Sequence, residues 1–540
     1  MPQHFSMSFL TLCLCSLTIH QAFAAPVAAG PTVTISDGTI IGTAIKPTNQ
    51  PSLNASANAY LGVPFAKSPP ERFSPPEAAS SWSTPLQAQA IKPACIQQFS
   101  GSAQTQARIE EYFNNPNGPA PVESEDCLYL NVYTPPGVTP DSKKAVMFWL
   151  FGGDLQFGTG SLQYYDGSSL AITQDVVVVS INYRTNIFGF SNSPDVPFGS
   201  QNSGYLDQRL ALQWVQQNIA SFGGDPSRVT IFGESAGGES VKQLLANPPS
   251  PRPFSAAILQ SENAIFTGEG LASYKQVLAN FGCNDVACLR GVDAMQIKSY
   301  IGANSLNFPP VNGDGTSIDD VRPSIQAKKW ANVPTFFGTN LNEARAFLAV
   351  AGLNNGTAIV NGALASVGIT DPKITQSVLA KYAAQSVVDQ YLVADRIITD
   401  YEFTCSTATI SSFLARNGYT TYRYRYDASF PSTALFANSG AYHTSEIPEV
   451  FGTYPASDQF GTATTQQIAL SAFMQKTWAG FAKSPAGGVG WPKVGSALGK
   501  ELGLLGSNGG SGVDVVNTIV ADYPCALYAN IGDPLKLYWK

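Results

Sequence analysis

The feature that most constrains this chain is a serine flanked by glycines, within the segment 229–238 of sequence VTIFGESAGG. β-Branched residues open the segment and predict a strand, and apolar residues at helical spacing follow it and predict a helix. Ser235 would then lie at a sharp strand-to-helix turn, where side chains at positions 233 and 237 would clash, so glycine is required at both. Such a nucleophile elbow exposes the serine hydroxyl and directs the N–H of Ala236 toward a developing negative charge.

The first 24 residues predict an export signal. Residues 9–19 are apolar over a suitable length, and Ala22-Phe23-Ala24 forms a small-residue cleavage pattern, although no Lys or Arg precedes them. We therefore expect residues 1–24 to be a signal peptide and residues 25–540 to form a single secreted domain. No later stretch is long and apolar enough to predict a membrane-spanning helix.

Composition narrows the partners of the exported chain. The net charge is −7 with no run of basic residues, which argues against nucleic acid or an anionic membrane. Two of the eight cysteines fall in the expected signal, and the remaining six allow three disulfides in fifteen pairings. Sequons for N-glycosylation begin at Asn54 and Asn355. The spacing of Cys and His indicates no metal site, and we expect no cofactor.

Apolar strands alternate with helical segments along the chain. Residues 145–151 and 176–181 are continuous apolar runs, as expected for strands covered on both faces, and residues 206–220 have a helical period. The alternation predicts an α/β fold with a large, mostly parallel central sheet and helices on both faces. The region 345–420 is expected to be mainly helical and to cap the sheet.

Acyl transfer by a serine needs a base, a group that orients the base, and donors for the oxyanion. Of the three histidines, His4 and His20 lie in the expected signal, so His443 is the candidate base. The orienting acid is expected between serine and histidine along the chain. Glu343 follows the apolar strand 334–337, at the sheet edge where such folds place their ligands, and is the candidate acid.

A second glycine turn follows the apolar run that ends at Phe151. Its residues are Gly152, Gly153 and Asp154. Backbone N–H groups in a turn after a core strand are suited to stabilise an oxyanion, so this turn is the candidate source of the remaining donors.

Longer stretches resemble the type B carboxylesterase and cholinesterase-like family of α/β-hydrolases, over nearly all of the mature chain. The stretches that carry the resemblance are EDCLYLNV at 125–132, NYR at 182–184, DQRLALQWV at 207–215, FGGDP at 222–226 and GESAGG at 233–238. Together they imply an α/β-hydrolase fold and a small-molecule ester as substrate.

The resemblance also implies roles for particular residues. It implies a catalytic triad of Ser235, Glu343 and His443, and oxyanion amides from Gly153, Asp154 and Ala236. It implies a second hydrogen-bonded pair behind the histidine, at Ser261 and Glu446. The disulfide pairs that it implies are Cys95–Cys127, Cys283–Cys288 and Cys405–Cys525.

Two residues depart from the family pattern. Asp154 stands where the family usually has a third glycine, and a carboxylate beside the oxyanion would oppose the developing charge. We expect its side chain to point away and its backbone N–H to remain functional. Glu262 stands where the family usually has glycine, and we make no prediction for its effect.

The segment between Cys95 and Cys127 bears on substrate class. In cholinesterases the corresponding loop supplies a tryptophan that holds a quaternary ammonium group by a cation–π contact. Here the loop contains no Trp, which argues against choline esters. In lipases of the family the loop is an apolar lid, whereas here most of its residues are polar, with Ile109, Tyr112 and Phe113 among the apolar ones.

The sequence therefore favours a secreted carboxylic-ester hydrolase that acts on short and medium acyl chains. Three alternatives remain open. One is a lipase for longer acyl chains, and another is an acyltransferase or lactonising enzyme of secondary metabolism that uses the same triad. The third is a catalytically silent homologue used in binding, against which the intact Ser235, Glu343 and His443 argue.

Overall fold

The structure is a computed structural model that describes residues 30–47, 53–116, 118–262, 269–353, 357–383, 389–496 and 498–529. The expected signal peptide and the sequon at Asn355 lie outside these residues, whereas Asn54 is described and exposed.

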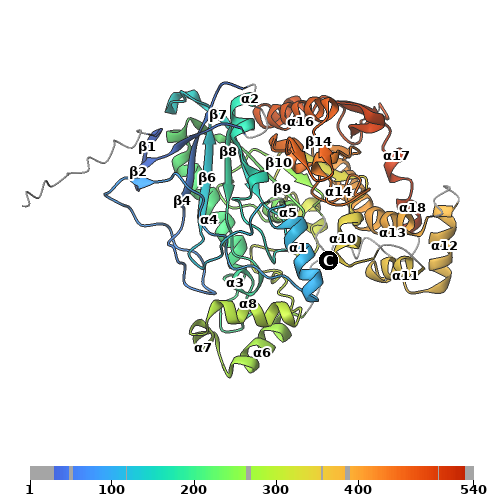
Figure 1. Ribbon diagram of the computed structural model, residues 1–540, viewed down its shortest axis with the longest axis horizontal. Helices are drawn as coiled ribbons and strands as arrows, with labels where there is room; N and C mark the ends of the chain where they lie inside the picture. Colours follow the sequence, from blue (N-terminus) through green and yellow to red (C-terminus); the bar gives the residue numbers. More distant parts are fainter. Residues whose placement is uncertain are drawn as a thin grey trace, which may run out of the picture.

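An 11-stranded sheet forms the centre of the described structure (Figure 1). From one edge to the other, its strands are β16 (Val513–Val516), β15 (Leu502–Leu505), β12 (Thr421–Tyr426), β11 (Thr335–Asn340), β10 (Ala256–Gln260), β9 (Gly224–Glu234), β7 (Lys144–Leu150), β8 (Val177–Ile181), β6 (Tyr129–Thr134), β4 (Ala57–Pro64) and β3 (Thr43–Ile45). The strands from β15 to β8 are parallel, and those beyond either end pair antiparallel. Two small sheets lie outside it, formed by β1 (Thr32–Ile35), β2 (Gly38–Ile41) and β5 (Leu86–Gln87), and by β13 (Ser457–Asp458) and β14 (Gly461–Thr462).

Helices cover both faces of the sheet because alternate residues of each strand point to opposite sides. On β7, Val146, Phe148 and Leu150 belong to a core that also contains residues of α4 (Ser203–Asn218), α5 (Ala236–Ala246) and α14 (Cys405–Arg416). Met147 and Trp149 belong to the opposite core, with residues of α2 (Ser168–Gln174), α15 (Ile447–Phe451) and α16 (Thr465–Lys483). The parallel strands are therefore buried on both faces, which explains their continuous apolar sequences.

The remaining helices lie outside the ends of the sheet or on its loops. They are α1 (Ala103–Phe113), α3 (Asn186–Gly189), α6 (Gly270–Phe281), α7 (Val286–Arg290), α8 (Ala294–Ala303), α9 (Arg322–Gln326), α10 (Ala344–Val350), α11 (Thr357–Ser366), α12 (Pro372–Ala383), α13 (Gln390–Ile398), α17 (Ile519–Asp522) and α18 (Cys525–Ala529). A π-helical turn, η4 (Thr399–Thr404), joins α13 to α14. In Figure 1, α6, α7 and α8 gather at the bottom, and α11 and α12 lie at the right.

The fold class predicted from the sequence is confirmed, and so is the mainly helical region at 345–420. The elements β7, β8 and α4 begin and end within three residues of the predicted bounds. Strand β11 differs, because it continues to Asn340 instead of ending near residue 337. The polar end of this strand is ordered by parallel pairing with β12, in which Asn340 lies opposite Tyr426.

Three disulfides tie loops to this framework. The bonds Cys95–Cys127, Cys283–Cys288 and Cys405–Cys525 are all present, as the resemblance implied. The first closes the loop that carries α1. Across the described ranges, no helix combines the length and the apolar character needed to cross a bilayer.

The unexpected Glu262 belongs to a buried group of charges beneath α5. Lys242 Nζ lies 2.5 Å from Glu239 Oε2 and 3.1 Å from Glu262 Oε2. Burial acts to lower the pKa of Lys242, but the two carboxylates outweigh it and raise the pKa above its ordinary value. The glutamate thus compensates a buried cation and links α5 to the end of β10.

We predict that Lys242→Met strongly destabilises the fold. The substitution leaves two carboxylates buried without their cation, which typically costs about 3–5 kcal/mol. Urea denaturation of the disulfide-intact protein measures the loss. Lys144→Met is the matched control, because its partner Asp175 is 58% exposed and such surface pairs contribute about 1 kcal/mol or less. Equal, small losses for both variants would contradict the prediction.

Candidate active site

Ser235 occupies the turn between β9 and α5 in a strained conformation. Its φ is 55° and its ψ is −125°, a combination that costs on the order of 1–3 kcal/mol for a residue with a side chain. The flanking glycines are required by close packing. A Cβ atom at Gly233 would lie 2.5 Å from the backbone of Gly237, and one at Gly237 would lie 2.0 Å from the carbonyl oxygen of Leu150. The local geometry is therefore that of a nucleophile elbow.

His443 and Glu343 are adjacent although 100 residues separate them. His443 Nδ1 lies 2.7 Å from Glu343 Oε2, so its N–H donates to the carboxylate. The other oxygen, Oε1, accepts hydrogen bonds from the Asn340 N–H and the Ser261 hydroxyl, both at 2.6 Å. Because these donors hold the buried carboxylate in place, they also fix the orientation of the imidazole ring.

Ser235 and His443 line the same cavity, which has a volume of about 460 Å³. Helices α1 and α10 and the turn η4 contribute much of its wall. The large side chains of the wall include Tyr112, Phe113, Phe157, Tyr165, Phe347 and Phe403. The catalytic candidates thus lie in a cavity with many aromatic wall residues, of the size expected for a small-molecule ligand.

The Nε2 edge of the imidazole contacts a residue that the sequence did not identify as a candidate. His443 Nε2 lies 3.2 Å from Oε1 of Glu234, the residue before Ser235. The rings of Phe347 and Phe403 lie 4.9 and 5.2 Å from the imidazole, centroid to centroid. The position of an acidic residue directly before Ser235 was the sequence signal that could have identified Glu234 as part of the site.

Buried carboxyl groups set the charge of this cluster. Burial acts to lower the pKa of His443, but Glu234, Glu343 and Glu446 outweigh it and raise the pKa to about 9. Burial also raises the pKa of Glu234 well above its ordinary value. Glu402, carried by η4, faces the same cavity, and burial raises its pKa to about 7. No local sequence pattern marks Glu402, because only the π-helical turn brings it to the cavity.

The expected pair behind the histidine is arranged differently. Ser261 donates to Glu343, as described above, and not to Glu446. Glu446 instead accepts hydrogen bonds from Gln260 Nε2 at 2.9 Å and from Asn340 Nδ2 at 2.7 Å. Successive residues at the end of a strand direct their side chains to different sides. Gln260 therefore forms the hydrogen bond to Glu446 that was expected from Ser261.

The second glycine turn lies beside the elbow. Gly152, Gly153 and Asp154 line the cavity together with Ser235. Gly153 has a φ of 106°, and a Cβ atom there would lie 2.4 Å from the carbonyl oxygen of Phe157, so only glycine fits. Within the described part of the chain, the N–H groups of Gly153, Asp154 and Ala236 form no hydrogen bond with the protein. These three amides remain able to donate to a ligand.

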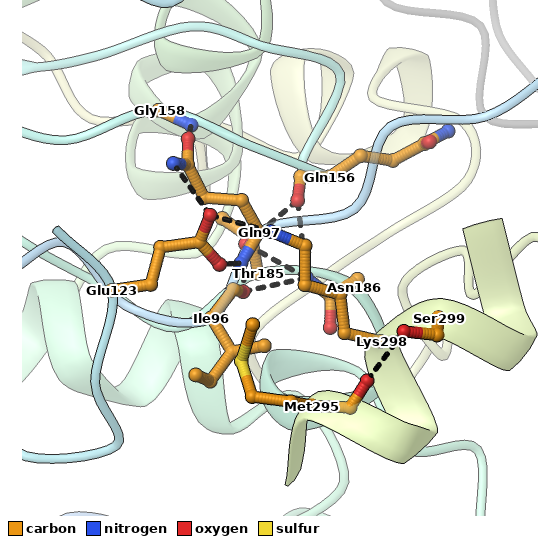
Figure 2. Close-up of polar contacts among 10 residues, drawn as sticks. All are labelled: Ile96, Gln97, Glu123, Gln156, Gly158, Thr185, Asn186, Met295, Lys298 and Ser299. Atoms are coloured by element: carbon orange, nitrogen blue, oxygen red, sulfur yellow. Dashed lines mark hydrogen bonds and ion pairs between the residues drawn. The ribbon is translucent and has the colours of Figure 1, made fainter. Parts of the chain in front are cut away.

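The loop closed by Cys95–Cys127 anchors this turn from outside the sheet. Figure 2 shows Gln97 of this loop in contact with Gly158, which follows the glycine turn, and with Glu123, near the other end of the loop. Gln97 Oε1 accepts from the Gly158 N–H at 2.8 Å, and the Gln97 backbone N–H donates to Glu123 at 2.9 Å. Lys298 on α8 contacts the same carboxylate at 2.5 Å. A buried polar chain thus links α8 and the disulfide loop to the end of the glycine turn.

Comparisons with known proteins show which proteins the chain is similar to. A model of the carboxylesterase family matches residues 29–505. The chain is 32% identical to liver carboxylesterase of Sus scrofa over 527 residues, which cover 88% of this chain and 89% of that protein. It is 33% identical to acetylcholinesterase of Bungarus fasciatus over 80% of this chain and 76% of that protein. It is 39% identical to cocaine esterase of Homo sapiens over 58% of this chain and 56% of that protein.

We predict that the imidazole of His443 titrates with a midpoint near pH 9, well above the ordinary value of about 6.5. Because the folded-state pKa is the higher one, the contribution of this cluster to stability is complete below about pH 6.5 and is lost as the pH rises through 9. NMR of histidine-labelled protein measures the midpoint, with the resonance assigned by its loss in His443→Asn.

Glu234→Gln should lower that midpoint, because it removes a carboxylate that stabilises the imidazolium. The matched control is Glu77→Gln, whose carboxylate is 69% exposed and pairs with Lys67. An identical midpoint in Glu234→Gln and in the control would show that Glu234 does not act on the ring.

Proposed function

This chain belongs to the carboxylesterase family of carboxylic-ester hydrolases, and we propose that it cleaves esters through an acyl-enzyme on Ser235. The observation that carries the proposal is the position of Ser235 at a strained elbow, in one cavity with His443, whose Nδ1 is bonded to Glu343. A nucleophile, a base and a group that orients the base are the parts that acyl transfer requires.

Each residue has a distinct role in the proposed reaction. Ser235 Oγ attacks the ester carbonyl while Nε2 of the neutral form of His443, whose population grows as the pH rises toward the midpoint near 9, accepts its proton. Glu343 holds Nδ1–H and stabilises the imidazolium that forms. Since Nε2 lies 3.2 Å from Glu234 Oε1, the ring exchanges that contact for the serine hydroxyl as the reaction begins. The alcohol leaves with the proton from His443, and water then hydrolyses the acyl-enzyme with the same base.

The oxyanion of each tetrahedral intermediate is proposed to bind the amides of Gly153, Asp154 and Ala236. Support comes from their absence of hydrogen bonds to other described residues and from the position of the glycine turn in the cavity wall. Loss of one such donor typically costs about 10²–10³ in kcat.

The cavity supports a preference for short to medium acyl chains. Its volume of about 460 Å³ suits a small ester, and α1 closes part of its wall through Ile109, Tyr112 and Phe113. These apolar side chains on the loop also make a lipase the second candidate, because a helix at this place could open at a lipid surface. The two candidates differ in how activity depends on substrate aggregation.

We predict that a series of p-nitrophenyl esters shows highest kcat/KM for short to medium acyl chains. Ser235→Ala should lower kcat by at least about 10⁴-fold, since removal of a triad nucleophile leaves only binding and the oxyanion site. The control is Ser299→Ala on α8, whose hydroxyl bonds to the carbonyl of Met295 and lies outside the cavity (Figure 2).

Unchanged turnover in Ser235→Ala would refute the assignment of the nucleophile. A sharp rise in activity above the solubility limit of a long-chain ester would replace the esterase proposal with the lipase.

We further propose that residues 1–24 direct export, that residues 25–540 form one secreted domain, and that Asn54 is glycosylated. The three disulfides support an oxidising compartment, and Asn54 is exposed. Expression in a eukaryotic secretory host should release protein that begins at Ala25, as read by N-terminal sequencing. Endoglycosidase should reduce its mass, by less in Asn54→Gln; a retained Met1 would contradict the export proposal.

A further inference from the structure

Asp154 adds a carboxylate to the turn that carries the proposed oxyanion amides, which a glycine in its place would not. Its φ of 56° is in the left-handed region, which Asp tolerates better than most residues. Asp154 lies in the turn that lines the cavity together with Ser235, so a carboxylate is part of the wall around the proposed oxyanion site. A mobile carboxylate there would compete with the oxyanion for the same donors and repel its charge.

A chain of hydrogen bonds reaches this carboxylate from the disulfide loop. Gln156 Nε2 donates to Asp154 Oδ2 at 2.9 Å, and Gln156 Oε1 accepts from the Ser100 hydroxyl at 3.1 Å. Ser100 Oγ in turn accepts from Gln98 Nε2 at 3.0 Å, and the same nitrogen donates to the carbonyl oxygen of Leu306 at 2.6 Å.

The chemistry of these groups determines the direction of the chain. The carbonyl of Leu306 can only accept, so the side-chain nitrogen of Gln98 must face it and also donate to Ser100. The Ser100 hydroxyl then donates to the oxygen of Gln156. This leaves the side-chain nitrogen of Gln156 facing Asp154, where a donor to a carboxylate forms a strong, charge-assisted bond.

The backbone of Gln156 is fixed as well. Its carbonyl oxygen accepts hydrogen bonds from Thr185 Oγ1 at 3.0 Å, from Asn186 Nδ2 at 3.0 Å and from the Gln98 N–H at 2.9 Å. Figure 2 shows the first two bonds, with the side chain of Gln156 extending away from them. The Gln156 amide is therefore held at a defined place, from both its backbone and its side-chain oxygen.

Several titratable groups face the same cavity as the Asp154 carboxylate. Although Asp154 is exposed, desolvation by its surroundings raises the pKa of its carboxyl above the ordinary value, and the bond from Gln156 opposes this rise. Glu402 and Glu234 face the same cavity as carboxyl groups, and His443 is its cation. The phenol groups of the wall are those of Tyr112, Tyr164, Tyr165 and Tyr442, and the described lining residues include no Lys or Arg.

We propose that Gln156 is a positioning residue, which holds the Asp154 carboxylate away from the oxyanion site so that the Asp154 N–H can donate there. The inference rests on the proposed ester hydrolysis by Ser235. It explains how this chain accommodates a carboxylate at the turn: a fixed amide donor occupies the carboxylate and keeps it from the developing charge.

The test is a double-mutant cycle between residues 154 and 156. Wild type, Gln156→Leu, Asp154→Gly and the double variant are assayed with p-nitrophenyl acetate at pH 6 and pH 8. Gln156→Leu should lower kcat about tenfold at pH 8 with little change in KM, because part of the stabilisation by one oxyanion donor is lost. The loss should be smaller at pH 6, where more of the Asp154 carboxyl is protonated.

In the Asp154→Gly background the same substitution should change kcat by less than about twofold, because no carboxylate remains to be held. Gln156→Glu, which keeps the shape of the side chain, provides the second variant and should lower kcat more at pH 8 than at pH 6 through repulsion of Asp154. Because Asp154 interacts with Glu402, which interacts with His443, the midpoint of His443 is measured in each variant and rates are compared at equal fractions of neutral imidazole.

Equal losses from Gln156→Leu in both backgrounds, or no loss in either, would overturn the proposal. The outcome is distinct from failure of the proposed function, because that failure appears in Ser235→Ala. Retained activity in Ser235→Ala would refute the assignment of Ser235 as the nucleophile. An additive cycle in an enzyme that depends on Ser235 would refute only the positioning role of Gln156.

Discussion

The strained turn at Ser235 is the constraint on which the rest of the site depends. A residue with φ 55° and ψ −125° is stable only where the surroundings leave no alternative, and here β9 and α5 are both fixed by large apolar cores. Gly233 and Gly237 let the turn approach the end of β7, from which the second glycine turn starts. The strained turn therefore lies beside the segment that carries the candidate oxyanion amides, which supports the proposed role of Ser235 as the nucleophile.

A single imidazole among buried carboxylates is the second determinant of the site. Two of the carboxylates have further partners besides the imidazole: Glu343 accepts from Asn340 and Ser261, and Glu446 accepts from Asn340 and Gln260. Asn340 belongs to both groups through its backbone and its side chain. The arrangement favours the charged imidazole, so it stabilises the form of the ring that appears during proton transfer.

The loops outside the sheet are as organised as the sheet itself. The Cys95–Cys127 loop contributes α1 to the cavity wall and holds the glycine turn through Gln97 and Gln98. Because α1 and the contacts to the glycine turn belong to this one loop, a change there affects the candidate oxyanion amides and the cavity wall together. The buried pairing of Lys242 and Glu239 on α5 with Glu262 links the helix that follows the elbow to the segment after β10.

Local patterns determined much of this protein by themselves. The elbow around Ser235, the parallel strands and the candidates His443 and Glu343 follow from glycine spacing, apolar runs and the scarcity of histidine, because strand propensity and short-range sterics are encoded within a few residues. Only the tertiary structure decided that Gln260 and not Ser261 reaches Glu446, and that Glu234, Glu402 and Gln156 face the site. Those contacts join residues from separate loops and a π-helical turn, and their side-chain directions depend on packing across the whole fold.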